Sequence, residues 1–247
     1  MFTLPLSLIV NSSFGVSFEL KTGAQDSAPK YFMNNGVMTG LCVEIMQAIS
    51  KENSNIKFSG YNKFFPFKRI KLNMKKGAFD IFLGFSRNPE REKIYHFVDT
   101  PLYSVKYIMA VKSNDNINIQ NFEDIRSLGK NGAILTLFGT ADVRFLKSQG
   151  GLTIDDGGFN LSSQFVKLLA NRGRLIYYHN IGLAYSIKKE GYTNKIKMLP
   201  SVFKTAYHYA AFSKKSPLNH VTAFEETLKK IQSNGVLDEI YNRYTSN

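Results

Sequence analysis

The residues with the clearest chemical potential lie in one loop between two apolar segments. Residues 79–83 are mostly apolar and predict a buried strand that ends at Gly84. The polar loop that follows carries Ser86, Asn88 and Arg91. Ligands of open α/β sheets bind beyond the carboxyl ends of strands, and a guanidinium fits a carboxylate with two parallel hydrogen bonds. The loop therefore predicts a binding site for a small anion.

Arg91 has two possible roles in this loop. A fixed guanidinium in a closing cleft that excludes water binds an anion strongly. The alternative is a surface arginine that pairs with Glu90 or Glu92. We expect Arg91 to bind the anion and the neighbouring Arg87 to be solvated.

A second group of anion donors is predicted at Gly139-Thr140-Ala141, directly before a predicted helix. The first N–H groups of a helix have no partner within it, so they and the hydroxyl of Thr140 can hold an anion. An ordinary helix cap by Thr140 is the alternative, and the two roles are compatible. We expect Thr140 and Ala141 to contribute to the site.

The order of the predicted elements indicates an α/β fold in two units. In the first unit, strands at 18–20, 56–58 and 79–83 alternate with helices at 41–51 and after Pro66. Residues 117–200 repeat the alternation, and two helices end the chain. This order predicts a parallel sheet. No flexible linker separates the units, so we expect two lobes that are joined by strands. The relative motion of the lobes would then be a hinge motion.

Composition excludes several classes of function. The formal net charge of +13 suits an anionic partner, but no Lys/Arg run is long enough for a nucleic-acid tail, so we expect a solvated basic surface and no nucleic-acid partner. The single cysteine, Cys42, excludes an internal disulfide and a cysteine metal site, and we expect it to be buried. The four histidines form no metal pattern, so we expect no metal and no cofactor.

The N-terminal residues 1–17 are apolar and then small, as in a secretory signal peptide or its remnant, although the usual basic start is missing. We therefore expect export of the mature chain.

Four segments, taken in order, resemble those of type II periplasmic solute-binding proteins, and more closely the polar amino-acid group, family 3, that feeds ATP-driven importers. They are NGVMTGLCVEIMQAI, the stretch from FPFKRIK to DTPLY, NFEDI followed by AILTLFGT, and QSNGVLDEIYNRY. The resemblance implies a two-lobed Venus flytrap fold with a ligand cleft between the lobes and crossovers near 101–106 and 205–210. Lobe 1 would hold residues 18–103 and 208–247, and lobe 2 residues 104–207.

The resemblance also implies roles for residues of the first lobe. In the family, the arginine of a Thr-x-x-Arg motif clamps the α-carboxylate of the ligand, and Arg91 holds that position, with Asn88 in place of the threonine. Gly84 and Ser86 fall where the family bonds ligand oxygen and ammonium. Asp26 falls in a loop that often supplies a carboxylate to the ligand ammonium, although an Asp in a turn is equally a local cap.

The sequence departs from the family after the strand at 174–178. Many relatives have an acidic residue there for the α-ammonium, whereas this chain has the neutral Asn180 and, within the strand, Ile176. A keto acid, dicarboxylate, modified amino acid or small peptide is therefore also possible as ligand. We keep Asn180 as a candidate ligand residue.

Aromatic side chains could enclose an apolar or cationic part of the ligand. The candidates are Phe65, Phe67, Tyr177 and Tyr178. Core packing is the alternative for each, so we expect one or two in the site, with Phe65 and Tyr178 preferred. Lys30 could add anion affinity or neutralise Asp26.

The resemblance implies a periplasmic, monomeric protein that captures a small carboxylate-bearing solute, such as an amino acid, for the membrane permease of an ABC importer. One alternative is a ligand-sensing module that binds a sensor protein. The other is an enzyme similar to prephenate or arogenate dehydratases, which would need His179 or Glu44 as a general acid. No other catalytic pattern is present, so we expect a binding protein that is not an enzyme.

Overall fold

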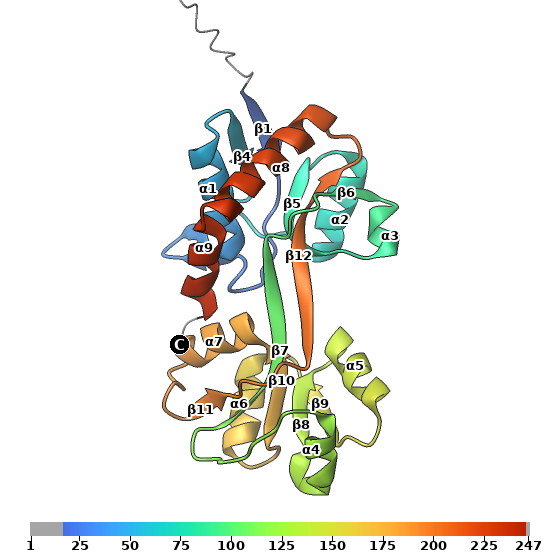
Figure 1. Cartoon of the computed structure of the whole chain (residues 1–247), viewed down its shortest axis with the longest axis vertical. Coiled ribbons are helices and arrows are strands. Elements are labelled where there is room, and N and C mark those ends of the chain that lie inside the picture. Colours follow the sequence, from blue (N-terminus) through green and yellow to red (C-terminus); the bar gives the residue numbers. More distant parts are fainter. Residues whose placement is uncertain (1–16, 246–247) are drawn as a thin grey trace, which may run out of the picture.

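The described part of the chain, residues 17–245 of a computed structural model, forms two groups of helices and strands joined by two long strands (Figure 1). The first group, at the top of Figure 1, contains β1 (Phe18–Lys21), β2 (Phe32–Asn34), β3 (Val37–Thr39), α1 (Leu41–Glu52), β4 (Ile56–Ser59), α2 (Phe67–Lys76), β5 (Ile81–Ser86), α3 (Pro89–Glu92), β6 (Tyr95–Phe97), α8 (Leu218–Ser233) and α9 (Val236–Thr245). The second contains α4 (Phe122–Ser127), the 3-10 turn η1 (Gly129–Gly132), β8 (Ile134–Leu137), α5 (Ala141–Gln149), β9 (Ile154–Gly158), α6 (Leu161–Leu169), β10 (Leu175–His179), α7 (Asn180–Lys189) and β11 (Ile196–Met198).

The connecting strands are β7 (Tyr103–Lys112) and β12 (Lys204–Ser213), which lie side by side through the middle of the molecule (Figure 1). They are antiparallel, with Tyr103 opposite His208 and Tyr107 opposite Lys204. The chain thus passes between the two groups through a pair of hydrogen-bonded strands.

The prediction of a parallel sheet is wrong for the central sheet. Its order is β5-β12-β7-β10-β8-β9, with β10, β8 and β9 parallel, and with β12 antiparallel to β5 and β7. The reason is the path of the chain: β12 comes late in the sequence and returns into the first group in the opposite direction to its neighbours. Only β1 and β4 keep the predicted parallel pairing in the first group.

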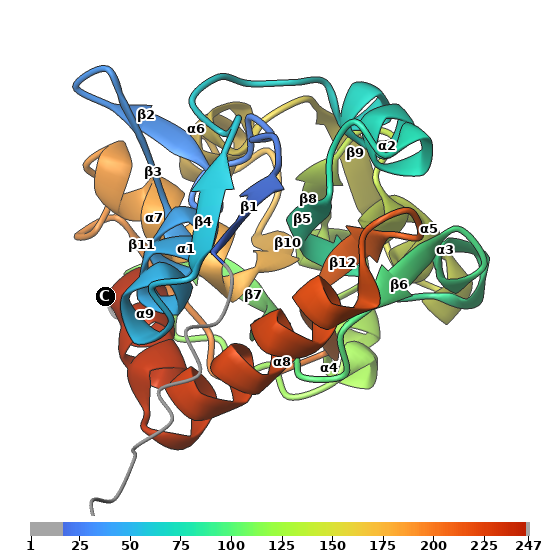
Figure 2. The same ribbon diagram turned by 90° about the horizontal axis from the view of Figure 1, so that it is seen from above.

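Each group has its own apolar core. In the first, α1, α8 and α9 pack together on one side, with α2 and α3 on the other (Figure 2), and buried residues such as Ile45, Phe82 and Phe224 fill the space between. In the second, Phe165 belongs to a core on one face of the sheet and Leu146 to a core on the other. Helices therefore cover both faces of the part of the central sheet that lies in the second group, as in other α/β proteins.

The structure also bears on the N-terminal segment, on membrane spans, on metal sites and on Cys42. The predicted signal segment, residues 1–17, lies outside the described residues except for Ser17. Within residues 17–245, no helix is long and apolar enough to cross a membrane, and no cluster of His, Cys, Asp and Glu in that range could hold a metal ion. Cys42 is fully buried, as expected from the sequence.

Candidate ligand-binding cleft

A cavity of about 420 Å³ lies between the two groups of elements. The first group supplies residues 25–30 to its lining, and the long strands supply Val105, Tyr107 and His208. The second group supplies residues 140–142 at the start of α5, and Tyr178, His179 and Ile181 of β10 and α7. Of the predicted site residues, Asp26, Thr140, Ala141 and Tyr178 therefore meet in one cleft. Because both groups supply walls, a ligand here would touch both.

Arg91 lies beside this cleft in α3. Asn88 caps the turn, because its side-chain oxygen accepts a hydrogen bond from the Arg91 N–H at 2.9 Å. Nη1 of Arg91 donates to the carbonyl and hydroxyl oxygens of Ser86 at 2.7 and 2.5 Å. The guanidinium also lies 5.9 and 5.2 Å from the ring centres of Phe67 and Phe85. Arg91 is only partly exposed to solvent, and this burial lowers the pKa of its guanidinium.

The alternative role predicted for Arg91, a surface pair with Glu90 or Glu92, is absent among the described residues. Glu92 pairs instead with Arg87, which also contacts Asp99 at 3.0 Å. Arg87 thus has two carboxylates, whereas Arg91 has none within residues 17–245. The charge of Arg87 is therefore neutralised by its neighbours, whereas that of Arg91 is available to an anion.

Strand β5 does not end at Gly84, as the sequence had predicted, but continues to Ser86 through a bulge. Gly84 has φ 91°, and a Cβ there would lie 3.0 Å from the hydroxyl of Tyr103. Only glycine fits such a position without strain. After the bulge, Ser86 lies opposite His208, a residue of the cleft wall. Arg91 and Ser86 are thereby held next to the cleft, although Gly84, Ser86 and Arg91 are not themselves among the residues that line the cavity.

Lys30 is a second cation on the same side. The first two N–H groups of α1 donate to the carbonyls of Pro29 and Lys30 at 3.0 and 3.1 Å. Gly40 permits this approach, since its φ is 122° and a Cβ would lie 2.5 Å from the Lys30 oxygen. Within residues 17–245, Lys30 is half-buried as a residue and its ammonium has no acidic partner. Burial lowers its pKa, and repulsion from Arg91 contributes.

Two histidines of the cleft are neutral. Burial, with a contribution from the charge of Lys30, lowers the pKa of His179 and of His208 to about 3. Nδ1 of His179 accepts a hydrogen bond from the Gly182 N–H at 3.0 Å and so caps α7. Nδ1 of His208 lies 2.9 Å from the hydroxyl of Tyr103. At neutral pH these imidazoles add no charge to the cleft.

The N-terminus of α5 forms part of the opposite wall. Thr140 is its N-cap residue, but the hydroxyl donates to the carbonyl of Leu137 at 2.8 Å and accepts no hydrogen bond from the helix. The ordinary side-chain cap is therefore absent at Thr140. The first N–H groups of α5 are left for another acceptor, and a helix N-terminus favours an anion.

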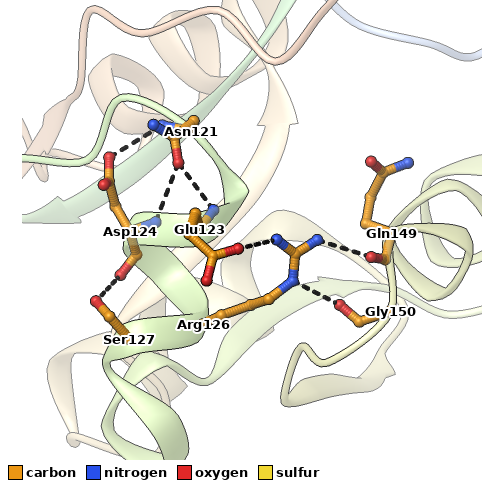
Figure 3. Close-up of polar contacts among 7 residues, drawn as sticks. All are labelled: Asn121, Glu123, Asp124, Arg126, Ser127, Gln149 and Gly150. Atoms are coloured by element: carbon orange, nitrogen blue, oxygen red, sulfur yellow. Dashed lines mark hydrogen bonds and ion pairs between the residues drawn. The ribbon is translucent and has the colours of Figure 1, made fainter.

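The other end of α5 is fixed by α4 (Figure 3). Arg126 donates to the carbonyls of Gly150 and Gln149 at 3.0 and 2.8 Å, and it pairs with Glu123 at 2.6 Å. Helix α4 itself begins with a capping box at Asn121. These contacts satisfy carbonyls at the C-terminus of α5 and hold the helix with its N-terminus in the cleft wall.

Asn180 has different partners from those expected of a ligand residue. Its side-chain oxygen accepts a hydrogen bond from the Lys106 N–H at 2.9 Å, and its Nδ2 donates to the Tyr241 hydroxyl at 3.1 Å. Asn180 thus links β7 to α9 across the two groups of elements. It does not line the cavity.

Four other predicted residues differ in how they lie relative to the cleft. Asp26 is exposed, and Phe65 lines a smaller neighbouring cavity of about 330 Å³ that shares Gln25 and Asp26 with the main one. Tyr178 is half-buried with its ring 4.2 Å from that of His179. Tyr177 is fully buried behind this wall.

Asp142, Tyr107 and His208 are among the residues of the cleft wall that sequence reasoning missed. Tyr107 and His208 belong to the long strands, whose side chains looked like ordinary sheet residues. Asp142 had a weak signal, because it follows Thr140 and Ala141 directly in the predicted anion site.

Comparison with known proteins identifies the family. No curated protein matches the sequence. Among solved structures, the probable amino-acid ABC transporter extracellular-binding protein ytmK from Bacillus subtilis is similar, with TM-score 0.79 and 18% identity over 94% of this chain and 99% of its own. The second substrate-binding domain of a putative amino acid ABC transporter from Streptococcus pneumoniae gives TM-score 0.77 and 22% identity over 93% of this chain and all of its own.

A third similar structure is the ancestral amino acid-binding protein AncCDT-1, described as a precursor of cyclohexadienyl dehydratase, with TM-score 0.67 and 22% identity over 92% of this chain and 95% of its own. At such identities the three structures support the fold alone, and they confirm the predicted two-lobed architecture. The sequence profile of bacterial extracellular solute-binding proteins, family 3, matches residues 20–247. The chain therefore belongs to the bacterial extracellular solute-binding proteins of family 3.

Proposed function

We propose that this protein captures a small carboxylate-bearing solute, an amino acid or a related compound, by closure of two lobes and delivers it to the permease of an ABC importer. Lobe 1 comprises residues 18–103 and 208–247, and lobe 2 residues 104–207. The strands β7 and β12 are the hinge. The family supports an extracytoplasmic location, and we propose that the protein works in the periplasm as a monomer.

The observation that carries the proposal is the pair of cations, Arg91 and Lys30, which have no acidic partner in the described structure. Charges taken partly out of water are unfavourable unless a counter-charge is close. Two such charges at one cleft therefore favour the binding of an anionic ligand. Arg91 suits a carboxylate because one edge of its guanidinium is positioned by Ser86.

The second lobe would complete the site through the N–H groups at the start of α5, which Thr140 does not cap. A solute that bonds Arg91 and these N–H groups together interacts with both lobes only when they are close. Such a differential interaction shifts the population toward the closed form. Closure then excludes water and strengthens the contact with the guanidinium.

A dehydratase is less well supported by the geometry. His179 lies in the cleft, but its lowered pKa keeps it unprotonated, so it is a poor general acid. Glu44 lies outside the cleft lining and accepts a hydrogen bond from Arg243 Nε at 3.1 Å. A ligand-sensing module would use the same site and differ only in the protein that recognises the closed form.

A screen of thermal stability tests the proposal. The purified protein is heated with L-amino acids, keto acids, dicarboxylates and small peptides, each in excess. A solute at about 100 times its dissociation constant adds about 2.7 kcal/mol to the native state, which raises the melting temperature of a protein of this size by roughly 5–10 °C. The absence of any shift with all carboxylate compounds would contradict the proposal. Conversion of added prephenate to phenylpyruvate would instead favour the enzyme alternative.

A further inference from the structure

Asp142 is a buried carboxylate in the cleft wall without a partner. It is the second residue of α5, lines the cavity and is only 6% exposed. Within residues 17–245, no hydrogen bond or ion pair reaches its side chain. Buried carboxylates are otherwise paired or hydrogen-bonded. This one faces a space that a ligand can enter.

The surroundings of Asp142 are aromatic. Tyr107, Tyr177 and Tyr178 lie close enough for its charge to raise the pKa of each phenol, after burial. The hydroxyl of Tyr177 is buried and also lacks a hydrogen-bond partner. Tyrosine ring faces and a carboxylate together form an environment that attracts a cation.

Lys204 is the cation that acts on Asp142 from within the protein. Its ammonium lies 5.3 Å from the ring centre of Tyr107 and 5.0 Å from that of Phe145. Its charge lowers the pKa of Asp142, but burial acts in the other direction and prevails, so the pKa is raised to about 6. At neutral pH the carboxylate is therefore ionised without a direct partner.

We propose that Asp142 receives a positively charged group of the solute, and that the protein therefore selects amino-bearing carboxylates over keto acids and dicarboxylates. This inference rests on the proposed function. The solute carboxylate would lie against Arg91 and the N–H groups of α5, and its ammonium against Asp142 and the rings of Tyr107 and Tyr178. Asp142 would thus serve the purpose that the sequence suggests for Asn180, whose side chain bonds Lys106 and Tyr241 instead.

A purely structural role explains Asp142 less well. An acidic residue in the first turn of a helix complements the helix dipole, but an exposed position serves that purpose without loss of hydration. Asp142 is instead buried in the wall of the cleft. Neutral side chains of the same shape, such as Asn, would avoid that cost.

The test compares wild type with Asp142→Asn by calorimetric titration and melting shift. The probes are the twenty common L-amino acids and, for each one that binds, the same molecule without its α-amino group and, where present, without its side-chain amine. Glutaramic acid thus matches L-glutamine, while norleucine and 6-aminohexanoate match L-lysine. Asp156→Asn is the control, because this half-exposed carboxylate of the same lobe pairs with Lys147 outside the cleft.

We expect an amino acid to bind wild type and Asp156→Asn alike, and to bind Asp142→Asn more weakly by about 30-fold or more, as for loss of one partner of a buried charge pair. An analogue that lacks the relevant amine should bind wild type weakly and lose nothing further in Asp142→Asn. Equal amino-acid affinity in wild type and Asp142→Asn overturns the inference and leaves the proposed function intact. Binding of keto acids or dicarboxylates alone does the same. If no compound binds wild type, both the inference and the proposed function fail.

Discussion

The substitution Asp142→Asn should make the ligand-free protein more stable at neutral and alkaline pH. Burial raises the pKa of Asp142 from 3.8 to about 6 in the folded protein. The folded state thus binds this proton more tightly than the unfolded chain does. The stability contributed by protonated Asp142 is fully present below about pH 4 and is lost as the pH rises through about 6.

The size of the effect follows from the shift. The rise of the pKa from 3.8 to about 6 corresponds to a penalty of about 3 kcal/mol for the ionised carboxylate in the folded protein. Asparagine cannot ionise, so the variant escapes this penalty and should melt roughly 6–12 °C higher than wild type at pH 8.

The assay is melting of both proteins from pH 4 to pH 8 without ligand. The tyrosines and histidines near Asp142 do not imitate the effect between pH 4 and pH 8. Tyr107, Tyr177 and Tyr178 remain neutral because their pKa values are raised, and the pKa values of His179 and His208 are lowered to about 3. The difference between variant and wild type should be near zero at pH 4 and reach its full value above pH 7. A constant difference, or one that falls with pH, would refute the argument for a buried, unpartnered carboxylate.

Three further substitutions test the parts of the cleft. Lys30→Gln should weaken binding of a carboxylate solute about tenfold in calorimetry, through loss of one unpaired cation, and unchanged affinity would place Lys30 outside the site. Arg126→Ala should lower stability to urea by about 1–2 kcal/mol, because the carbonyls of Gln149 and Gly150 lose their donors, and an unchanged midpoint would contradict the clamp on α5. Gly84→Ala should cost about 1–3 kcal/mol by the same measurement, since its φ of 91° and the nearby Tyr103 hydroxyl leave no room for a methyl group.

Much of the fold could be predicted from apolar spacing. Helix α1 and strand β10 lie close to their predicted spans, because their buried residues recur at helical or strand intervals. Strand β5 overlaps its predicted span but ends later, at Ser86. Strand β9 was not predicted, because Ile154–Gly158 contains two Asp and two Gly and pairs only with β8 at the edge of the sheet. The relative direction of neighbouring strands could not be predicted from local sequence either, since β12 pairs with β5 across more than a hundred residues.

The site was predictable where chemistry and local structure coincide. Thr140 and Ala141 begin a helix, and Arg91 follows a strand, so both positions follow from nearby residues. Asn180 looked similar, but its partner Tyr241 lies on α9, and nothing in the surrounding sequence signals that contact. Asp142 was missed for the opposite reason: an acidic residue in a first helical turn is common, and only the tertiary structure shows that this one is buried in a cleft.

The claim that Arg91 holds the solute carboxylate is tested most directly by calorimetric titration of Arg91→Ala, with Arg87→Ala as the matched control. The two arginines lie four residues apart, but Arg87 already pairs with Glu92 and Asp99, whereas Arg91 has no acidic partner among the described residues. For the best solute from the thermal screen, we expect Arg91→Ala to lose affinity by about 30-fold or more, with its circular dichroism unchanged, and Arg87→Ala to bind like wild type. Wild-type affinity in Arg91→Ala, or an equal loss in both variants, would contradict the account.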